Sequence, residues 1–148
     1  GICIATVNLA FEKDVTVSSQ SSLSDLPDAL VDGDLETDWE SDSDDETPWA
    51  VIDLGESQSI SYVTFHQTHW PDDGAENFEI HLSNDNINYN LVGSGSFPSA
   101  DTAQGVDVAL NNVAGRYVKI VPTSWFGLNP GFAEIEIFNG CIRSRVEY

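Results

Sequence analysis

The sequence predicts an all-β domain, an eight-stranded antiparallel β-sandwich of the jelly-roll type. Three observations predict it. Short stretches of alternating apolar and polar residues recur along the 148-residue chain, clusters of Gly, Asn, Asp, Ser and Pro separate them, and no long segment repeats apolar residues at helical spacing. About eight such stretches in one chain are typical of a sandwich or jelly roll. We find no internal repeat or linker in the sequence, so residues 1–148 are expected to form a single domain.

The expected strands are short. In one of them Phe78, Ile80 and Leu82 share one face, and polar residues occupy the other. The stretch Trp49–Leu54 is almost entirely apolar, which predicts a central strand. In chain order, the expected strands are Asp14–Ser19, Trp49–Leu54, Ile60–Gln67, Asn77–Ser83, Tyr89–Ser94, Val106–Leu110, Arg116–Pro122 and Phe132–Phe138.

The chain is strongly acidic. It has 25 Asp and Glu residues against 5 Lys and Arg, a formal net charge of −20. A field of this sign repels phosphate backbones and anionic lipid headgroups, so nucleic acid and an anionic membrane are poor partners. Cations, and neutral ligands held by carboxylates, are better ones. The many aromatic residues argue against a disordered acidic segment.

The two cysteines, Cys3 and Cys141, lie near opposite ends of the chain. Their position favours a disulfide that closes the domain, and two free thiols are the alternative. The chain also lacks methionine, even at position 1, which we interpret as a processed and secreted product, although a trimmed chain would look the same.

The most acidic segment is Asp25–Glu46, in which 11 of 22 residues are Asp or Glu. It lies between two expected strands and therefore predicts a long loop region at one end of the sandwich. Ca²⁺ prefers six to eight oxygen ligands, and a tight turn bearing Asp32, Asp34 and Thr37 supplies several. The spacing differs from that of an EF-hand. From the spacing alone, a solvated acidic turn explains these residues equally well.

Six motifs in order resemble the discoidin superfamily, which includes coagulation factor 5/8 type C domains, family 32 carbohydrate-binding modules and F-type lectins. The resemblance covers about residues 5–141 and leaves a short tail, 142–148. The motifs are Asn8–Ala10, Ala29–Trp39, Trp49–Gly55, Phe78–Asp85, Gly115–Ile120 and Ala133–Phe138.

The resemblance implies a jelly-roll sandwich, and in many members a disulfide joins the two termini, which fits Cys3 and Cys141. Sugar-binding members commonly hold one structural Ca²⁺. Here it implies ligands from the Ala29 carbonyl, the Asp32 side chain, the Asp34 carbonyl, the Thr37 hydroxyl and carbonyl, the Ala133 carbonyl and the Glu134 side chain. The ion would fix the loop rather than activate water.

Members of this superfamily bind ligands through loops at one end of the sandwich, which here correspond to Trp39–Pro48, Thr68–Glu76 and Thr123–Gly131. Indole rings can stack on the C–H face of a sugar, while His, carboxylate and amide groups bind its hydroxyls. Trp39 and Trp49 are expected to pack in the core or against loops. The expected glycan contacts are Glu40, His69, Trp70, Asp72, Asp73, Asn77, Trp125, Phe126 and Asn129.

The chain departs from its relatives in its arginines. Fucose-binding F-type lectins use a His with two Arg, and galactose-binding family 32 modules often place an Arg in the loop that here reads Pro71–Asp73. No Arg occurs before position 116. The resemblance therefore implies a glycan ligand, with galactose-type or amino sugars favoured over fucose.

The sequence thus predicts a secreted, calcium-containing lectin or carbohydrate-binding module without enzymatic activity, acting as an oligomer or as part of a multidomain protein. The alternative is an acidic adhesion or matrix protein that binds protein partners or Ca²⁺. The run Asp42–Glu46 is expected to be a solvated face, with a second weak cation or a cationic partner as alternatives.

Overall fold

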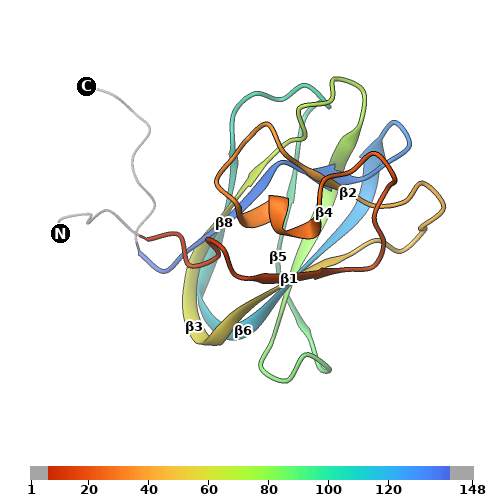
Figure 1. Cartoon of the computed structure of the whole chain (residues 1–148). Helices are drawn as coiled ribbons and strands as arrows, with labels where there is room; N and C mark the ends of the chain where they lie inside the picture. The colour runs from red at the N-terminus through yellow and green to blue at the C-terminus, as the bar shows by residue number, and fades with distance from the viewer. Residues whose placement is uncertain (1–6, 141–148) are drawn as a thin grey trace, which may run out of the picture.

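Two long strands form the spine of the fold. In the computed structural model, which describes residues 7–140, β3 spans Ala50–His66 and β6 spans Val106–Phe126. The two strands pair antiparallel, with a register shift between Asp53 and Gln58. Figure 1 shows both strands curving together at the lower left of the molecule. Each strand therefore contributes its two parts to two different layers.

The remaining strands pair with separate parts of this spine. β1 (Asp14–Val17) pairs with the first part of β3, and β8 (Glu134–Phe138) pairs with the last part. β4 (Gly74–Ser83) pairs with the second part of β6, and β5 (Asn90–Ser96) pairs with β4. Counting the two parts of β3 and β6 separately gives the eight expected strands, so the predicted all-β antiparallel sandwich is confirmed.

The strand boundaries differ from the expectation at the bends. We expected two separate strands within β3 and two within β6, because turn-forming residues interrupt the apolar pattern. The chain instead continues through a bend, where Gly55 takes a positive φ of 87° and donates its N–H to Asp53. Arg116 binds both carboxylate oxygens of Asp53 at 2.8 and 3.1 Å, which ties β6 to β3 beside the bend.

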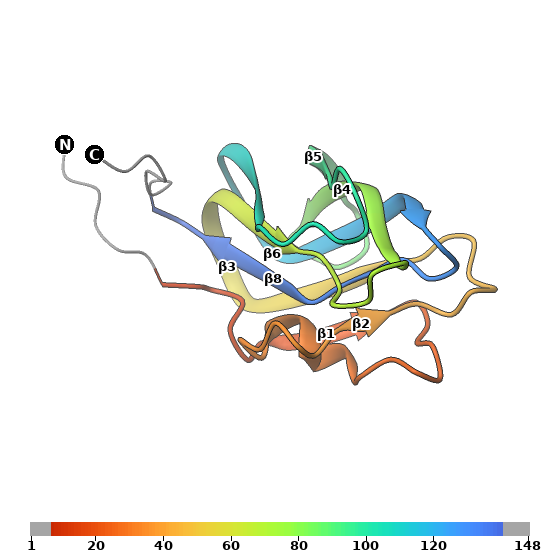
Figure 2. The same ribbon diagram turned by 90° about the horizontal axis from the view of Figure 1, so that it is seen from above.

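Two short elements were not predicted, and the expected strand Phe132–Phe138 is divided, with Phe132 in a third short element and β8 beginning at Glu134. A 3-10 helix, η1, spans Pro27–Val31 and buries its last three residues. The strands β2 (Trp39–Glu40) and β7 (Gly131–Phe132) pair only with each other. Two residues are too few to show a period in sequence. η1 and β1 lie along one side of the molecule, and β4 and β5 lie on the opposite side (Figure 2).

The core contains a cluster of phenylalanine rings beneath the loop-rich end. The ring centroids of Phe65 and Phe78 are 4.4 Å apart, and Phe132 lies 5.3 Å from Phe78 and 5.5 Å from Phe65. Trp39 is fully buried, as expected, and its indole N–H donates to the Ser19 carbonyl. Trp49 is half-buried, with Lys119 Nζ 5.4 Å from its ring centroid.

Two further expectations concern the chain ends and membranes. Cys3 and Cys141 lie outside the described residues, so their disulfide stays a prediction. Within residues 7–140 we find no helix that is both long and apolar enough to cross a membrane.

Phe132 links the β2–β7 pair to the core, so replacing it with alanine should destabilise the whole domain. We expect Phe132→Ala to lower the free energy of unfolding by about 3–5 kcal/mol, because it removes a fully buried ring and leaves a cavity. Urea denaturation measures this loss. Leu128→Ala, at a residue that is 72% exposed, is the control and should change little. A loss below about 1 kcal/mol for Phe132→Ala would show that the Phe132 ring contributes little to the stability of the domain.

Candidate functional site

Three loops that are distant in sequence interlock at one end of the sandwich, drawn at the upper right in Figure 1. The Ser41 N–H donates to the Pro130 carbonyl at 2.9 Å, and the Gly74 N–H donates to the Asn129 carbonyl at 3.1 Å. The Asn129 side-chain amide donates to the Ser41 carbonyl at 2.9 Å. The three loops predicted to bind ligand therefore meet at one place.

Asp38 connects the first of these loops to the second. Its carboxylate is 1% exposed and accepts both the backbone N–H of His69, at 3.2 Å, and the imidazole Nδ1 of His69, at 2.7 Å. Burial raises the pKa of Asp38, and the contacts with His69 oppose that rise. The pairing fixes the orientation of the His69 ring.

Trp70 stands next to His69 at the surface. The two ring centroids are 4.6 Å apart with planes inclined at 32°, and Trp70 is 41% exposed. A large aromatic ring that is partly held by a neighbour and partly open to solvent can stack on a sugar ring. His69 and Trp70 thus occupy the exposed positions that the sequence predicted for them.

Glu40 is the most unusual member of the predicted site. It is 4% exposed, and its Oε2 atom has no hydrogen-bond partner within the described part of the chain. Burial raises the pKa of Glu40 to about 8, and repulsion from Asp38 and Asp73 adds to the rise. We call Asp38, Glu40 and Asp73 the acid cluster. The neighbouring Ser41 hydroxyl is also buried, and no partner for it is found among residues 7–140.

Backbone packing holds the acid cluster in place. A Cβ atom on Gly131 would lie 2.8 Å from Glu40 Cγ and 2.2 Å from the Trp39 carbonyl oxygen, so only glycine fits there. Asp73 accepts the backbone N–H of Leu128 at 3.2 Å, which ties it to the third loop.

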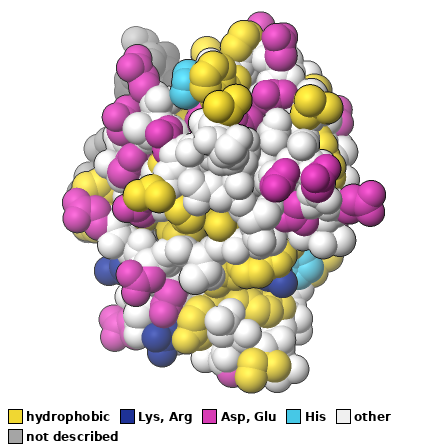
Figure 3. Space-filling model, turned by 45° about the vertical axis from the view of Figure 1, so that its right-hand side comes forward, with side chains coloured by type: hydrophobic (Ala, Val, Ile, Leu, Met, Phe, Trp, Pro, Cys, Tyr) yellow, Lys and Arg dark blue, Asp and Glu magenta, His cyan; other side chains and the backbone are white. Residues whose placement is uncertain are grey.

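The charge around the site is uniformly negative. Residues 18–48, 67–76 and 123–131 contain no Lys or Arg. In Figure 3, Asp and Glu side chains spread over the upper part of the visible face, and the Lys and Arg side chains lie in its lower half. The site therefore favours a cationic or hydroxyl-rich ligand over an anionic one.

The other predicted contacts belong neither to the acid cluster nor to the His69–Trp70 pair. The third loop begins later than expected, because Trp125 and Phe126 are the last residues of β6 rather than loop residues. Phe126 packs partly against the core, and Trp125 is half-buried opposite Ala75. Asn77 lies on β4, and its amide donates to Ser124. Asp72 is exposed at the surface.

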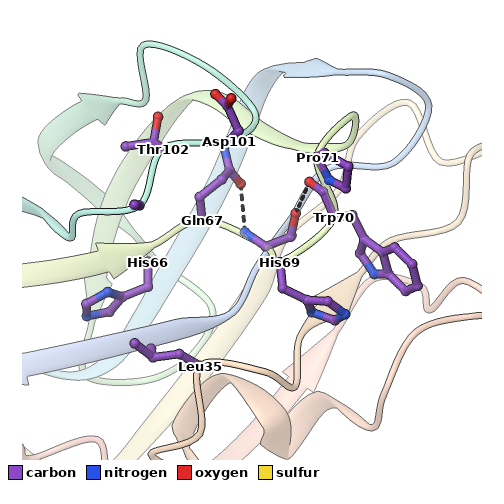
Figure 4. A pocket seen from close by; sticks show the side chains of 10 residues that line it. Leu35, His66, Gln67, His69, Trp70, Pro71, Asp101 and Thr102 are labelled. Atoms are coloured by element: carbon purple, nitrogen blue, oxygen red, sulfur yellow. Dashed lines mark hydrogen bonds between the residues drawn. The ribbon is translucent and has the colours of Figure 1, made fainter.

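A hollow of about 270 Å³ is lined in part by His69 and Trp70 (Figure 4). We call it the histidine hollow. Two of its lining residues, His69 and Trp70, were predicted as contacts from the sequence, whereas neither His66 nor the segment around residue 101 was. The hollow is lined by Leu35, His66, Gln67, Thr68, His69, Trp70, Pro71, Asp101, Thr102 and Ala103.

The expected calcium ligands converge from two distant segments. Glu134 on β8 is 2% exposed and accepts the Gly33 N–H at 2.9 Å through Oε2. Its Oε1 atom is buried, and no partner for it is found among the described residues. Burial raises the pKa of Glu134 to about 8, and the nearby Asp32 carboxylate contributes to the rise. Two neighbouring carboxylates, one of them with an unpaired buried oxygen, fit a cation.

Hydrogen bonds of the Thr37 side chain close the turn Asp32–Thr37. The Thr37 hydroxyl donates to Asp32 at 2.6 Å and lies 3.2 Å from the Asp34 carbonyl oxygen. Ala29 and Ala133 are both buried. No group of three or more His, Cys, Asp or Glu side chains within residues 7–140 is arranged to hold a metal, and the expected site would take most of its oxygens from carbonyls and Thr37 instead.

The acidic run Asp42–Glu46 forms a hydrogen-bonded turn. Asp45 accepts the hydroxyls of Ser18 and Ser19, each at 2.6 Å. Burial alone would raise the pKa of Asp45, but these hydrogen bonds lower it. The other acidic residues of the run are exposed, which agrees with a solvated face.

The sequence matches the family model described as the F5/8 type C domain over residues 14–137. The chain therefore belongs to the F5/8 type C domain family, as the resemblance of its motifs predicted. A search of curated proteins finds no match.

Solved structures share the fold. A CBM32 module from Clostridium perfringens, in complex with GalNAc-β-1,3-galactose, aligns with a TM-score of 0.80 at 20% identity over 90% of this chain and 99% of that chain. Chitosan-binding module 1 of a chitosanase/glucanase from Paenibacillus sp. IK-5 gives 0.74 at 24% identity over 88% and 98%. A fucose binding module from Streptococcus pneumoniae gives 0.70 at 21% identity over 90% and 96%.

The raised pKa of Glu40 makes stability depend on pH. The folded carboxyl keeps its proton up to about pH 8, whereas an ordinary carboxyl releases it near 4.5. The stabilisation is complete below pH 4.5 and is lost as the pH rises through 8. Glu40→Gln cannot ionise, so we expect it to match the wild type at pH 4.5 and to be more stable at pH 8. The gain is a few kcal/mol at most, since one pKa unit corresponds to about 1.4 kcal/mol.

Urea denaturation of both proteins at steps between pH 4.5 and 8 measures this difference. Asp44→Asn, at an exposed residue of the acidic run, removes one carboxylate without burial and is the control. Parallel stability curves for wild type and Glu40→Gln would contradict the raised pKa of Glu40.

Proposed function

We propose that this domain is a non-catalytic carbohydrate-binding module or lectin that binds glycan through the interlocked end loops. The observation that carries the proposal is the arrangement of the end loops, in which Asp38 of the acid cluster holds the His69 ring beside the exposed ring of Trp70. Small-ligand sites commonly combine an apolar platform with a few convergent polar groups. Relatives of the same fold, solved with galactose and with GalNAc-β-1,3-galactose, support a glycan as the ligand class.

The favoured ligands are amino sugars, followed by galactose-type sugars. Burial makes ionisation of the Glu40 carboxyl costly, and a ligand ammonium group placed against it would offset that cost through a charge-assisted hydrogen bond. No Arg or Lys of the end loops competes for the carboxylate. The fold is shared with a module named as chitosan-binding. Galactose-type sugars would use Trp70 and His69 without needing a charge.

Acetylation of the ligand amine separates these two ligand classes. We expect oligomers of glucosamine to bind at least about tenfold more tightly than the same oligomers of N-acetylglucosamine, because acetylation removes the positive charge. Glu40→Gln should abolish that preference, whereas Asp44→Asn should keep it. Titration calorimetry at pH 7 measures the affinities, after an array of glycans has shown which classes bind.

Two outcomes would argue against parts of this proposal. Equal binding of acetylated and free-amine oligomers to the wild type would remove the amino-sugar preference and favour galactose-type ligands. If no glycan binds, or if Trp70→Ala leaves glycan affinity unchanged, the end loops are not the binding site.

We propose further that the turn at Asp32–Thr37 holds one structural Ca²⁺ together with Glu134. The unpaired buried Oε1 of Glu134 supports this proposal, because a cation would satisfy it. The ion would supply positive charge that neutralises Asp32 and Glu134. Through these ligands it would hold β8 against the early loop. The His69 ring is held by Asp38 and Glu40 is held by packing against Gly131, so neither depends on the ion.

Chelation tests the calcium proposal. We expect excess EDTA to lower the Tm, since a metal that binds only the folded state stabilises it. Glu134→Gln should weaken Ca²⁺ binding at least tenfold, or about 1.4 kcal/mol, in a direct titration. Glu36→Gln lies in the same turn with an exposed side chain and should bind Ca²⁺ like the wild type. A Tm that is insensitive to both EDTA and added Ca²⁺ would rule the ion out.

A second candidate function is adhesion in an extracellular matrix, favoured by the exposed carboxylates of Asp42–Glu46 at the same end of the molecule. Binding through exposed charge would weaken steeply as salt is added, whereas stacking of a neutral sugar would not. In either case we propose a secreted protein in which weak single sites act together, through an oligomer or a multidomain parent.

A further inference from the structure

The histidine hollow is built from three loops, of which sequence reasoning assigned only one to ligand binding. Leu35 comes from the turn of the expected calcium site, Asp101–Ala103 come from the connection between β5 and β6, and His66–Pro71 form the remaining wall. Figure 4 shows the ring of His66 on the left and the ring of His69 on the right, with Leu35 below and between them.

The lining of the hollow is amphipathic. His66 is held by Glu136, whose Oε1 lies 2.8 Å from its Nε2, and His69 is held by Asp38 through Nδ1. Each carboxylate contacts one ring nitrogen, and both rings line the hollow, so the two imidazoles can offer polar contacts to a ligand hydroxyl. Leu35, Pro71 and Ala103 supply apolar contact. Hydroxyl-binding groups beside apolar surface match the two kinds of surface on a sugar ring.

The floor of the hollow is rigid. The Gln67 amide donates to the Ala75 carbonyl at 2.7 Å, and the Thr68 hydroxyl donates to the Asp73 carbonyl at 2.9 Å. Both residues are buried. The Thr102 hydroxyl donates to the Ser99 carbonyl at 2.7 Å and closes the opposite wall. A preformed wall lowers the ordering cost of binding.

The hollow shares His69 with the acid cluster, because Asp38 of that cluster holds the His69 ring. Trp70 stands at the edge of the hollow (Figure 4). Pockets for drug-sized ligands measure about 300–1,000 Å³, so a hollow of about 270 Å³ is suited to roughly one sugar residue.

We propose that the histidine hollow is a second subsite, which receives the neighbouring sugar residue of a glycan whose first residue lies at the acid cluster. The ligand of this domain is then an oligosaccharide of at least two residues that crosses the His69–Trp70 pair. This inference rests on the proposed function and assigns Leu35, His66 and the segment Asp101–Ala103 to ligand recognition.

Filling the hollow tests the subsite without removing any hydrogen bond that shapes it. Ala103→Phe places a ring in the hollow at an exposed residue of its rim. Ala114→Phe makes the same change at an exposed residue that lines a different depression, together with Ser83 and Asn88, and is the matched control. Titration calorimetry compares glucosamine, its β-1,4-linked dimer and trimer, galactose and lactose on each protein. Circular dichroism confirms that both variants fold.

We expect the preferred disaccharide to bind the wild type at least about tenfold more tightly than its monosaccharide. Ala103→Phe should remove that gain and leave monosaccharide affinity within about twofold, whereas Ala114→Phe should keep it. If the monosaccharide binds and a second residue adds no affinity, or if Ala103→Phe keeps the gain, the subsite is wrong while the proposed function stands. If neither these sugars nor any glycan of the array binds the wild type, the proposed function fails and the subsite fails with it.

Discussion

The end of the molecule that we assign to binding depends on the buried carboxylate of Asp38. A charge removed from water must be paired, and the pairing partners are the backbone N–H and the ring of His69. The backbone of Asp38 also exchanges two hydrogen bonds with Asp25. The Asp38 N–H donates to the Asp25 carboxylate, and the Asp38 carbonyl accepts the Asp25 N–H. One residue therefore fixes two loops and sets the orientation of the ring shared by the acid cluster and the histidine hollow.

The short antiparallel ladder between β2 and β7, which has two residue pairs, fixes the acid cluster and the expected calcium site relative to each other. β2 and β7 pair through Trp39 with Phe132 and through Glu40 with Gly131. Thr37 lies two residues before this ladder on one strand, and Glu134 lies two residues beyond it on the other. Trp39 and Phe132 are both fully buried, so packing in the core fixes the position of this two-pair ladder. The positions of Thr37 and Glu134, two residues away from it, are fixed as a result. Stability of the core and geometry of the two sites are thus coupled.

The sequence was most informative where a repeating pattern or a turn carried the signal. Alternation in Phe78, Ile80 and Leu82 predicted their burial correctly. The run Asp32–Thr37 predicted a turn, and the resemblance to the discoidin superfamily implied that Glu134 lies beside it, as the hydrogen bond from Gly33 to Glu134 shows. Patterns failed where only distant contacts decide the structure. Nothing local distinguishes Glu40 as buried, because its burial comes from Gly131 on another strand. The same holds for Asp101–Ala103 in the histidine hollow and for Trp125 and Phe126 in β6. Their positions depend on contacts with distant residues, which a short stretch of sequence does not reveal.

The burial of Glu40 costs stability when the carboxyl ionises, and the same burial would favour a cationic ligand. Burial and the neighbouring carboxylates raise the pKa of Glu40 to about 8, so the free protein near neutral pH holds this group largely protonated. A cationic group arriving at the unpaired oxygen would favour the ionised form and release the proton. The packing at Gly131 and the hydrogen bond between Asp38 and His69 hold the backbone beside Glu40 in this buried position. Among hydroxyl-rich ligands, such a site would distinguish those that carry an amine from those that do not, because only the amine satisfies the charge.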